Sequence, residues 1–253
     1  MEQFKLSVFQ ATMRGQSGAA RLNWLDMAAD QASAEGARLL VCPELYLAGL
    51  STSGSDAHAA AEYVAQLADI AALHQISILG TGIESDGDVA FNTAFLADSS
   101  GEITYRHRKV HLTEEEAENF RPGRDFTVVS IDGWRIGVLL GRDLEFPESA
   151  RHAAFEGAEM LIVPAALTED RMFIADKMAP VRAFENRLFV VLANWSGSAG
   201  RQTFGGGSRI IAPDGTEDQV AGKGELLLSA VFDKHRLFVA REEINYVDRL
   251  RPV

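Results

Sequence analysis

Hydrophobic and polar positions along the chain predict a repeated exchange of strands and helices. Residues 4–11 read as a strand, and residues 18–35 carry apolar side chains at helical spacing after Ser17, a suitable N-cap. Residues 38–42 form the next apolar run, which Pro43 stops. A strand–helix–strand opening of this kind favours parallel pairing in a sheet that is covered by helices.

Further apolar runs of strand length follow, separated by turn signals such as Asp86-Gly87 and Asp132-Gly133. The predicted strands are residues 76–82, 91–96, 103–106, 125–131, 135–140, 160–163, 188–194, 208–212 and 224–232. The predicted helices are residues 57–73, 171–187 with a kink expected at Pro180, and 234–241 after the cap Asp233. The acidic residues 113–119 are expected to make one short helical turn at most, and the Gly- and Ser-rich residues 197–207 a flexible loop. Because no linker, composition break or repeat appears, we expect one α/β domain over residues 1–253, with mixed parallel and antiparallel strands.

One stretch predicts an abrupt change from strand to helix. Residues 136–140 are an apolar run, Pro147 suits the first position of a helix, and residues 149–156 continue with helical spacing. A sharp turn is therefore centred on residues 141–146. Such a turn holds one side chain up at the end of a sheet and directs backbone N–H groups at whatever binds there.

Charge and cysteine content narrow the class of protein. The net charge of −12 argues against nucleic acid or an anionic membrane as partner, because both need a basic patch. The one cysteine, Cys42, allows no intramolecular disulfide. No signal peptide or membrane-length apolar run is apparent, so a cytoplasmic location is expected.

Three charged positions stand out as candidates for chemistry. Glu44 follows Pro43 at the end of a predicted strand, Lys109 lies in the basic run at residues 106–109, and Glu118 belongs to an acidic run before Pro122. Taken alone, each position has a plainer interpretation. A glutamate after a strand-ending proline is most often a surface residue, and basic or acidic runs are usually solvated edges.

Together with the strand-to-helix turn, these motifs resemble the nitrilase superfamily, the carbon–nitrogen hydrolases that cleave amides and nitriles. The resemblance covers nearly the whole chain and implies a four-layer α-β-β-α sandwich of two mixed sheets. It implies that Glu44 is the general base and that Lys109 stabilises the oxyanion of a tetrahedral intermediate. It also implies a second structural or catalytic glutamate, placed at Glu118 rather than at residues 114–116. His107 and His111 are interpreted as structural.

The same resemblance exposes a gap at the nucleophile. In the family the strand ends in Cys, an aromatic residue and Asp, whereas this chain has Gly141, Arg142 and Asp143. The backbone N–H of Arg142 is expected to help hold the oxyanion. Supporting positions around the pocket are expected at Asp143, Glu145, Glu185 and Asn194.

Glycine has no side chain, so no acyl-enzyme can form at position 141. Cys42 is expected to be an inert core residue on another strand. The gap leaves open either an amidase whose nucleophile was lost, recently or by design, or a natural pseudoenzyme that binds a small amide or a protein partner. The retained Glu44, Lys109 and Glu118 favour the first interpretation, because buried charges are costly to keep.

The predicted activity is hydrolysis of a C–N bond in small amides once a thiol occupies position 141. A nitrilase or N-carbamoyl hydrolase remains the alternative within this class, and no metal or organic cofactor is expected. The resemblance also implies a homodimer or higher homo-oligomer. A nucleotide-binding module is disfavoured, because Gly205-Gly206-Gly207 lacks the strand-then-helix context of a phosphate loop.

Overall fold

Most strands of the protein form two six-stranded sheets that face each other. In the computed structural model, residues 4–13, 17–50 and 56–249 are described. The first sheet has the order β15 (Leu226–Phe232), β1 (Phe4–Gln10), β3 (Leu39–Val41), β4 (Ser77–Asp86), β5 (Val89–Ala97) and β6 (Ile103–Arg108). The second has the order β14 (Glu217–Val220), β13 (Arg209–Ile211), β10 (Phe189–Asn194), β9 (Met160–Ala165), β8 (Trp134–Val138) and β7 (Val128–Ile131).

Both sheets mix parallel and antiparallel pairs. In the first, β1, β3 and β4 run parallel, while β15, β5 and β6 pair antiparallel to their neighbours. In the second, β8, β9 and β10 run parallel, and β7, β13 and β14 are antiparallel. The parallel centre of each sheet is the part most deeply covered, as expected when helices lie over parallel strands.

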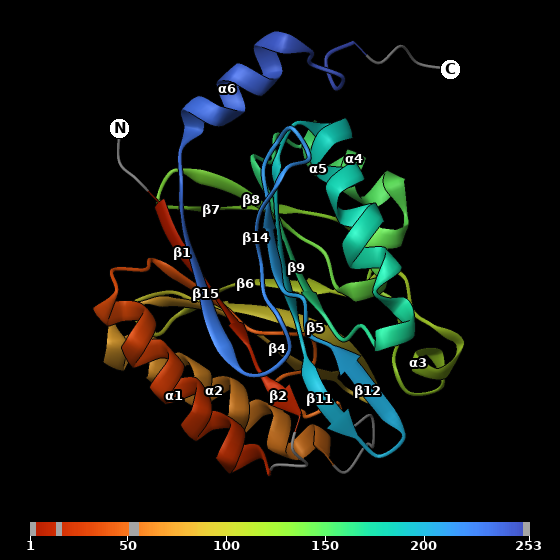
Figure 1. Cartoon of the computed structure of the whole chain (residues 1–253). Helices are drawn as coiled ribbons and strands as arrows, with labels where there is room; N and C mark the ends of the chain where they lie inside the picture. Colours follow the sequence, from red (N-terminus) through yellow and green to blue (C-terminus); the bar gives the residue numbers. More distant parts are fainter. Residues whose placement is uncertain (1–3, 14–16, 51–55, 250–253) are drawn as a thin grey trace.

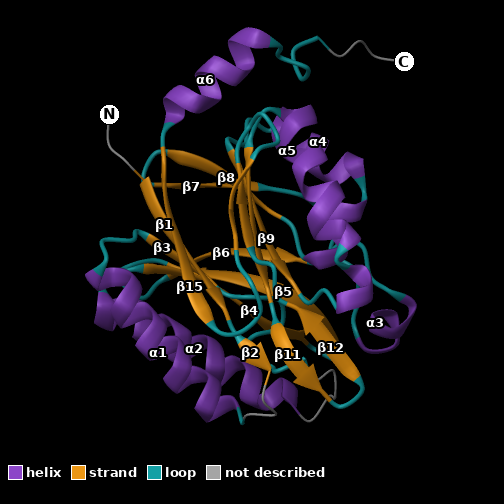
Figure 2. Ribbon diagram, in the orientation of Figure 1, coloured by secondary structure: helices purple, strands orange, loops and turns teal. Residues whose placement is uncertain are grey.

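Helices cover the outer face of each sheet (Figure 1), which completes four layers. Over the first sheet lie α1 (Gly18–Ala34) and α2 (Asp56–His74), and over the second lie α4 (Pro147–Phe155) and α5 (Ala179–Asn186). Two further helices lie at opposite ends of the sandwich (Figure 2). They are α3 (Glu114–Asn119) and α6 (Lys234–Glu243). The predicted α-β-β-α sandwich is confirmed.

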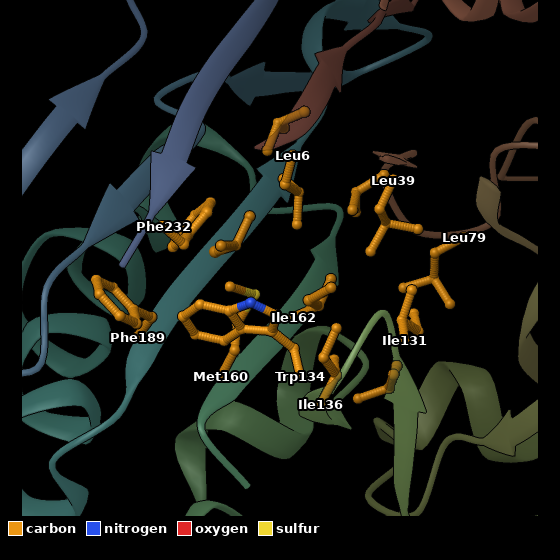
Figure 3. Packing of buried hydrophobic residues seen from close by; sticks show 14 of the residues in the cluster. Leu6, Leu39, Leu79, Ile131, Trp134, Ile136, Met160, Ile162, Phe189 and Phe232 are labelled. Carbon is orange, nitrogen blue, oxygen red and sulfur yellow. The ribbon is translucent and has the colours of Figure 1, made fainter. Parts of the chain in front are cut away.

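The sheets are held together by apolar side chains that alternate along each strand. Leu39 and Val41 of β3 point to the space between the sheets, where they meet Ile136 of β8 and Ile162 of β9 (Figure 3). Leu40 points the other way, into the layer beneath α1 and α2. A third cluster fills the space between the second sheet and α4 and α5. The three clusters are the three interfaces that four layers require.

Most predicted elements are confirmed, including the N-cap Ser17, whose Oγ accepts a hydrogen bond from the N–H of Ala20 at 3.3 Å. In place of the kink expected at Pro180, a π-helical turn, Ile174–Met178, lies directly before α5. Pro180 itself lies in the first turn of α5. The expectation that residues 113–119 hold one short helical turn at most is wrong in length, because α3 spans six residues.

The prediction of a flexible loop over residues 197–207 is wrong. This segment forms a hairpin of β11 (Ser196–Ala199) and β12 (Gln202–Gly205), and β11 pairs in parallel with β2 (Thr12–Met13). Small polar residues gave no apolar alternation to indicate a strand, and β2 and β14 were also missed. The hairpin is anchored by Phe204, which is buried against the first sheet's helical layer.

The strand-to-helix turn is as predicted. β8 ends at Val138, a 3₁₀ turn covers Gly141–Glu145, and α4 begins at Pro147. This turn meets the loop that follows β3 at the same end of the sandwich, because Glu44 and Gly141 lie side by side. Within the residues that the structure describes, no helix combines the length and apolar character needed to cross a membrane.

Candidate active site

Glu44 lies at the end of β3 and is almost completely buried. Its backbone is held on both sides: its N–H donates to the carbonyl of Ala165 at 3.3 Å, and the indole Nε1 of Trp195 donates to its carbonyl at 2.7 Å. One side-chain oxygen, Oε1, accepts hydrogen bonds from Lys109 Nζ at 2.7 Å and from Asn92 Nδ2 at 2.8 Å. The predicted surface alternative for Glu44 is therefore wrong.

Lys109 directly follows β6 and places its ammonium between two carboxylates. Its Nζ lies 2.7 Å from Glu44 Oε1 and 2.6 Å from Glu116 Oε1, and the side chain is 4% exposed. Burial alone would lower the pKa of Lys109, but the two carboxylates outweigh it and raise the pKa above its ordinary value. The ammonium is thus charged at neutral pH.

The same burial acts in the opposite direction on Glu44. Removal from water raises the pKa of the Glu44 carboxyl, the neighbouring Glu116 raises it further, and Lys109 opposes both. A carboxyl whose pKa is raised towards neutrality is suited to taking up and returning a proton.

The second glutamate beside Lys109 is Glu116, whereas the sequence analysis had placed it at Glu118. Glu118 is exposed on α3 and has no contact with Lys109. Glu116 is fixed by a capping box, in which its N–H donates to Thr113 Oγ1 at 3.1 Å and its Oε2 accepts from the Thr113 N–H at 2.9 Å. The spacing Thr113-x-x-Glu116 is a sequence signal that would have selected this residue.

Gly141 faces the free side of Glu44. Its φ is +40°, a left-handed conformation that glycine adopts without the steric cost of a Cβ. A Cβ placed on residue 141 would meet Glu44 Oε2 before any other atom outside its neighbours in sequence. A side chain at position 141 would therefore begin directly against the carboxylate oxygen that Lys109 and Asn92 leave free.

The turn that carries Gly141 is locked by Asp143, which is fully buried. Its carboxylate accepts from the backbone N–H of Leu140 at 3.1 Å and of His111 at 2.7 Å, and His107 Nε2 lies 3.6 Å away. Burial alone would raise the pKa of Asp143, but His107 and these N–H groups outweigh it and hold the pKa below its usual value. Asp143 thus joins the turn to the segment that carries Lys109.

The remaining predicted positions lie around the same turn and pocket. Arg182 donates to the carbonyls of Leu144 at 3.1 Å and Glu145 at 3.0 Å, and Glu185 holds the Arg182 guanidinium at 3.0 Å. Glu185 therefore supports the turn through Arg182, without reaching the pocket. The carboxylate of Glu145 accepts from Arg171 at 2.8 Å.

Asn194 fixes the wall of the pocket opposite Glu44. Its Oδ1 accepts from the Leu167 N–H at 2.7 Å, and its Nδ2 donates to the carbonyls of Leu167 at 3.1 Å and Gly206 at 2.8 Å. The adjacent Trp195 stacks on Tyr46, with ring centroids 5.4 Å apart. Trp195 and Asn92 were not selected from the sequence, because neither lies in a charged motif.

Cys42 points away from this site. It belongs to the apolar cluster between the first sheet and its helices, is fully buried, and burial raises the pKa of its thiol well above the usual range. The expectation that Cys42 is an inert core residue is confirmed in its burial and orientation. No attack on a substrate in the pocket can come from this thiol.

A cavity of about 310 Å³ opens above these groups. Lys109, Glu44, Glu116, Gly141 and Arg142 line its charged end. Its apolar wall consists of Leu45, Leu50, Ala166, Leu167 and Phe204. A larger groove of about 930 Å³ runs along β4, β5 and β6 and includes neither Glu44 nor Gly141. In the described part of the chain, no three His, Cys, Asp or Glu side chains are grouped to hold a metal ion.

The paired carboxylates, the buried ammonium and the strand-to-helix turn carry the motifs that resemble those of the carbon–nitrogen hydrolases. The chain belongs to the carbon-nitrogen hydrolase family, whose sequence profile matches residues 5–235.

Several named proteins are similar to this chain over most of their length. A "hydrolase in pqqF 5'region" from Pseudomonas protegens is 34% identical and spans 98% of this chain and 89% of the relative. The nitrilase of Pyrococcus abyssi is 32% identical over 87% of this chain and 82% of its own length. The 2-oxoglutaramate amidase of Bacillus subtilis is 28% identical over 85% of each chain.

The fold is also similar to solved amidase structures. A Glu-to-Gln variant of the amidase from Nesterenkonia sp. AN1, in which acrylamide has undergone Michael addition at the active-site cysteine, superposes with a TM-score of 0.87 and 31% identity. The match covers 95% of this chain and 98% of that one. A double variant of the same amidase in complex with acrylamide gives a TM-score of 0.89 at 29% identity, covering 98% of this chain and 94% of that one.

Proposed function

We propose that this site hydrolyses the C–N bond of small amides when a thiol occupies position 141, and that the chain with Gly141 binds such amides without turning them over. The observation that carries the proposal is the position of Glu44 Oε2, which faces the place where a Cβ of residue 141 would stand. Lys109, charged and held at Glu44 Oε1, supplies the positive charge that an oxyanion needs.

The proposed reaction has two halves. In the first, Glu44 takes the thiol proton, the sulfur attacks the amide carbonyl carbon, and the oxyanion is held by Lys109 and the backbone N–H of Arg142. The C–N bond then breaks, Glu44 returns the proton to the leaving nitrogen, and ammonia departs from a thioester. In the second half, Glu44 takes a proton from water and the hydroxide attacks the thioester. The C–S bond then breaks, Glu44 returns the proton to the leaving sulfur, and the carboxylic acid departs from the restored thiol.

The pocket supports a short acyl group. Its volume is about 310 Å³, and Leu45, Leu50, Leu167 and Phe204 give it an apolar wall opposite the charged cluster. The Nesterenkonia amidase, which is similar in fold, forms a complex with acrylamide. We therefore propose small aliphatic amides as the preferred class, with nitriles and N-carbamoyl compounds as the alternative within this family.

Ammonia release from a panel of amides, nitriles and N-carbamoyl compounds tests this proposal. The chain and the Gly141→Cys variant are measured side by side. Activity of the variant towards short amides, with none for the chain, is the expected result. Activity only towards nitriles or carbamoyl compounds would contradict the substrate class. If both proteins are inactive but calorimetry shows that the chain binds an amide, the pseudoenzyme interpretation replaces this one.

We also propose that the protein assembles as a homodimer or larger homo-oligomer. Large apolar side chains are exposed on the outer helices of the second sheet, namely Phe155 on α4 and Val181 and Phe184 on α5. A patch of this kind indicates a contact surface. Light scattering coupled to size exclusion should give at least twice the mass of one chain, and a mass of 27.5 kDa would contradict the proposal. The cytoplasmic location stays a prediction.

A further inference from the structure

We propose that Asn92 is a positioning residue that determines which oxygen of Glu44 carries the transferred proton. The inference rests on the proposed function and deepens it, because it assigns the proton to a particular atom. Asn92 lies on β5, between β4 and the edge strand β6 of the first sheet, and is fully buried. Nothing in the sequence motifs drew attention to it.

Asn92 holds both members of the central ion pair. Its Nδ2 donates to Glu44 Oε1 at 2.8 Å, and its backbone carbonyl accepts from the Lys109 N–H at 2.8 Å. The Lys109 ammonium also donates to Glu44 Oε1, at 2.7 Å. Glu44 Oε1 is therefore the acceptor of two hydrogen bonds from groups whose protons point at it.

These two donors exclude a proton from Oε1. A carboxylic acid proton on Oε1 would point at an ammonium or an amide N–H, neither of which can accept it. The proton that Glu44 takes up must then lie on Oε2, the oxygen that faces residue 141. If the Asn92 amide turned so that its oxygen faced Glu44 Oε1, the hydrogen bond that Nδ2 donates would be lost. Asn92 Oδ1 has no hydrogen-bond partner among the described residues.

A substitution at Asn92 removes none of the other charged groups near Glu44. The charged side chains that share its pocket are Lys109, Glu115, Glu116, Arg142, Glu145 and Arg171. None of them donates to Glu44 Oε1 except Lys109. Removal of the Asn92 amide thus removes one donor to the ionised form of Glu44, which disfavours that form and raises the pH at which Glu44 becomes a base.

The test compares Asn92→Leu with Thr93→Val, both in the Gly141→Cys background. Thr93 is the next residue on β5 and is equally buried, but its hydroxyl contacts Glu84 and not Glu44. The measurement is kcat/KM for a short amide as a function of pH. Asn92→Leu should lower kcat/KM by about tenfold to a hundredfold and move the acid limb to higher pH, because a hydrogen bond to a charged group is lost. Thr93→Val should leave the acid limb where it is.

Two outcomes would overturn the inference. One is a loss of rate in Asn92→Leu with an unmoved acid limb, which is what a merely structural role would give. The other is an equal shift of the limb in Thr93→Val. If Asn92→Leu does not fold, Asn92→Asp preserves the shape, replaces the donor by an oxygen and adds a negative charge beside Glu44 Oε1. Both changes disfavour the ionised form of Glu44, so the limb should move in the same direction, and an unmoved limb in this variant would overturn the inference.

A failure of the proposed function is distinguished by alkylation. The rate at which iodoacetamide modifies the thiol introduced by Gly141→Cys is measured against pH by mass spectrometry, and the buried Cys42 does not interfere. This rate reports proton transfer to Glu44 even if no amide is hydrolysed. In Asn92→Leu the pH profile of the alkylation rate should move to higher pH, and in Thr93→Val it should not move. Equal profiles for the two variants would reject the role of Asn92.

Discussion

Gly141→Cys is expected to raise the rate of amide hydrolysis by roughly three orders of magnitude or more over the unchanged chain, since a nucleophile accounts for most of the catalysis in enzymes that form an acyl intermediate. The surroundings of the thiol are already built. Glu44 Oε2 faces it, and Lys109 stays charged beside the pocket. Ammonia release under single-turnover and steady-state conditions measures the effect.

The matched control is Gly141→Ala, which adds the Cβ without the sulfur. Residue 141 has φ of +40°, so either substitution should cost about 1–2 kcal/mol of unfolding free energy from backbone strain. Both variants must also displace the Glu44 carboxylate, because the added Cβ would overlap its Oε2. Equal destabilisation with activity in the cysteine variant alone is expected. Hydrolysis by Gly141→Ala or by the unchanged chain would show that the nucleophile lies elsewhere.

Lys109→Met is expected to lower the free energy of unfolding by about 3–5 kcal/mol at neutral pH, because it leaves the buried Glu44 and the partly buried Glu116 without their shared cation. Glu44 and Glu116 both contact the Lys109 ammonium, within 2.7 Å. Lys223→Met is the matched control, since Lys223 is exposed and pairs with Glu169 at the surface. Its expected cost is at most about 1 kcal/mol.

The deficit of Lys109→Met should depend on pH with a defined sign. Burial and Glu116 already raise the pKa of Glu44, and the substitution removes the main group that opposes them. The folded protein then binds a proton more tightly than the unfolded chain does, so stability falls as pH rises through the raised pKa. Urea unfolding should show a smaller deficit near about pH 5 than near about pH 8. A deficit that does not change with pH would contradict this account.

The sequence predicted the fold well where strands are buried on both faces. The strands β3, β9 and β10 are buried at every position and read as nearly continuous apolar runs. The hairpin β11–β12 was missed because its strands consist largely of Gly, Ser, Thr and Gln, and it is held by backbone pairing and the single anchor Phe204. Hydrophobic periodicity detects buried faces, and only two of the eight residues in these strands, Ser196 and Phe204, are buried.

The site was predicted in part. Glu44, Lys109 and Gly141 stand out because each lies at the end of a strand in a distinctive motif, and the structure brings all three together. Glu116 was passed over for Glu118, although its capping box with Thr113 left a local signal. Asn92 left none, since its importance arises only when the folded sheet brings β5, two strands away from β3, to aim the amide at Glu44.

The pairing of β1 with β15 has a consequence for how the protein is made. Phe4 lies opposite Phe232 in the register of these strands, so β1 acquires its outer neighbour only after the long stretch of chain between them has been synthesised. Until then β1 presents an unpaired edge, the kind that favours association with other chains. We expect nascent or truncated chains that lack residues 226–232 to depend on chaperones, whatever residue occupies position 141.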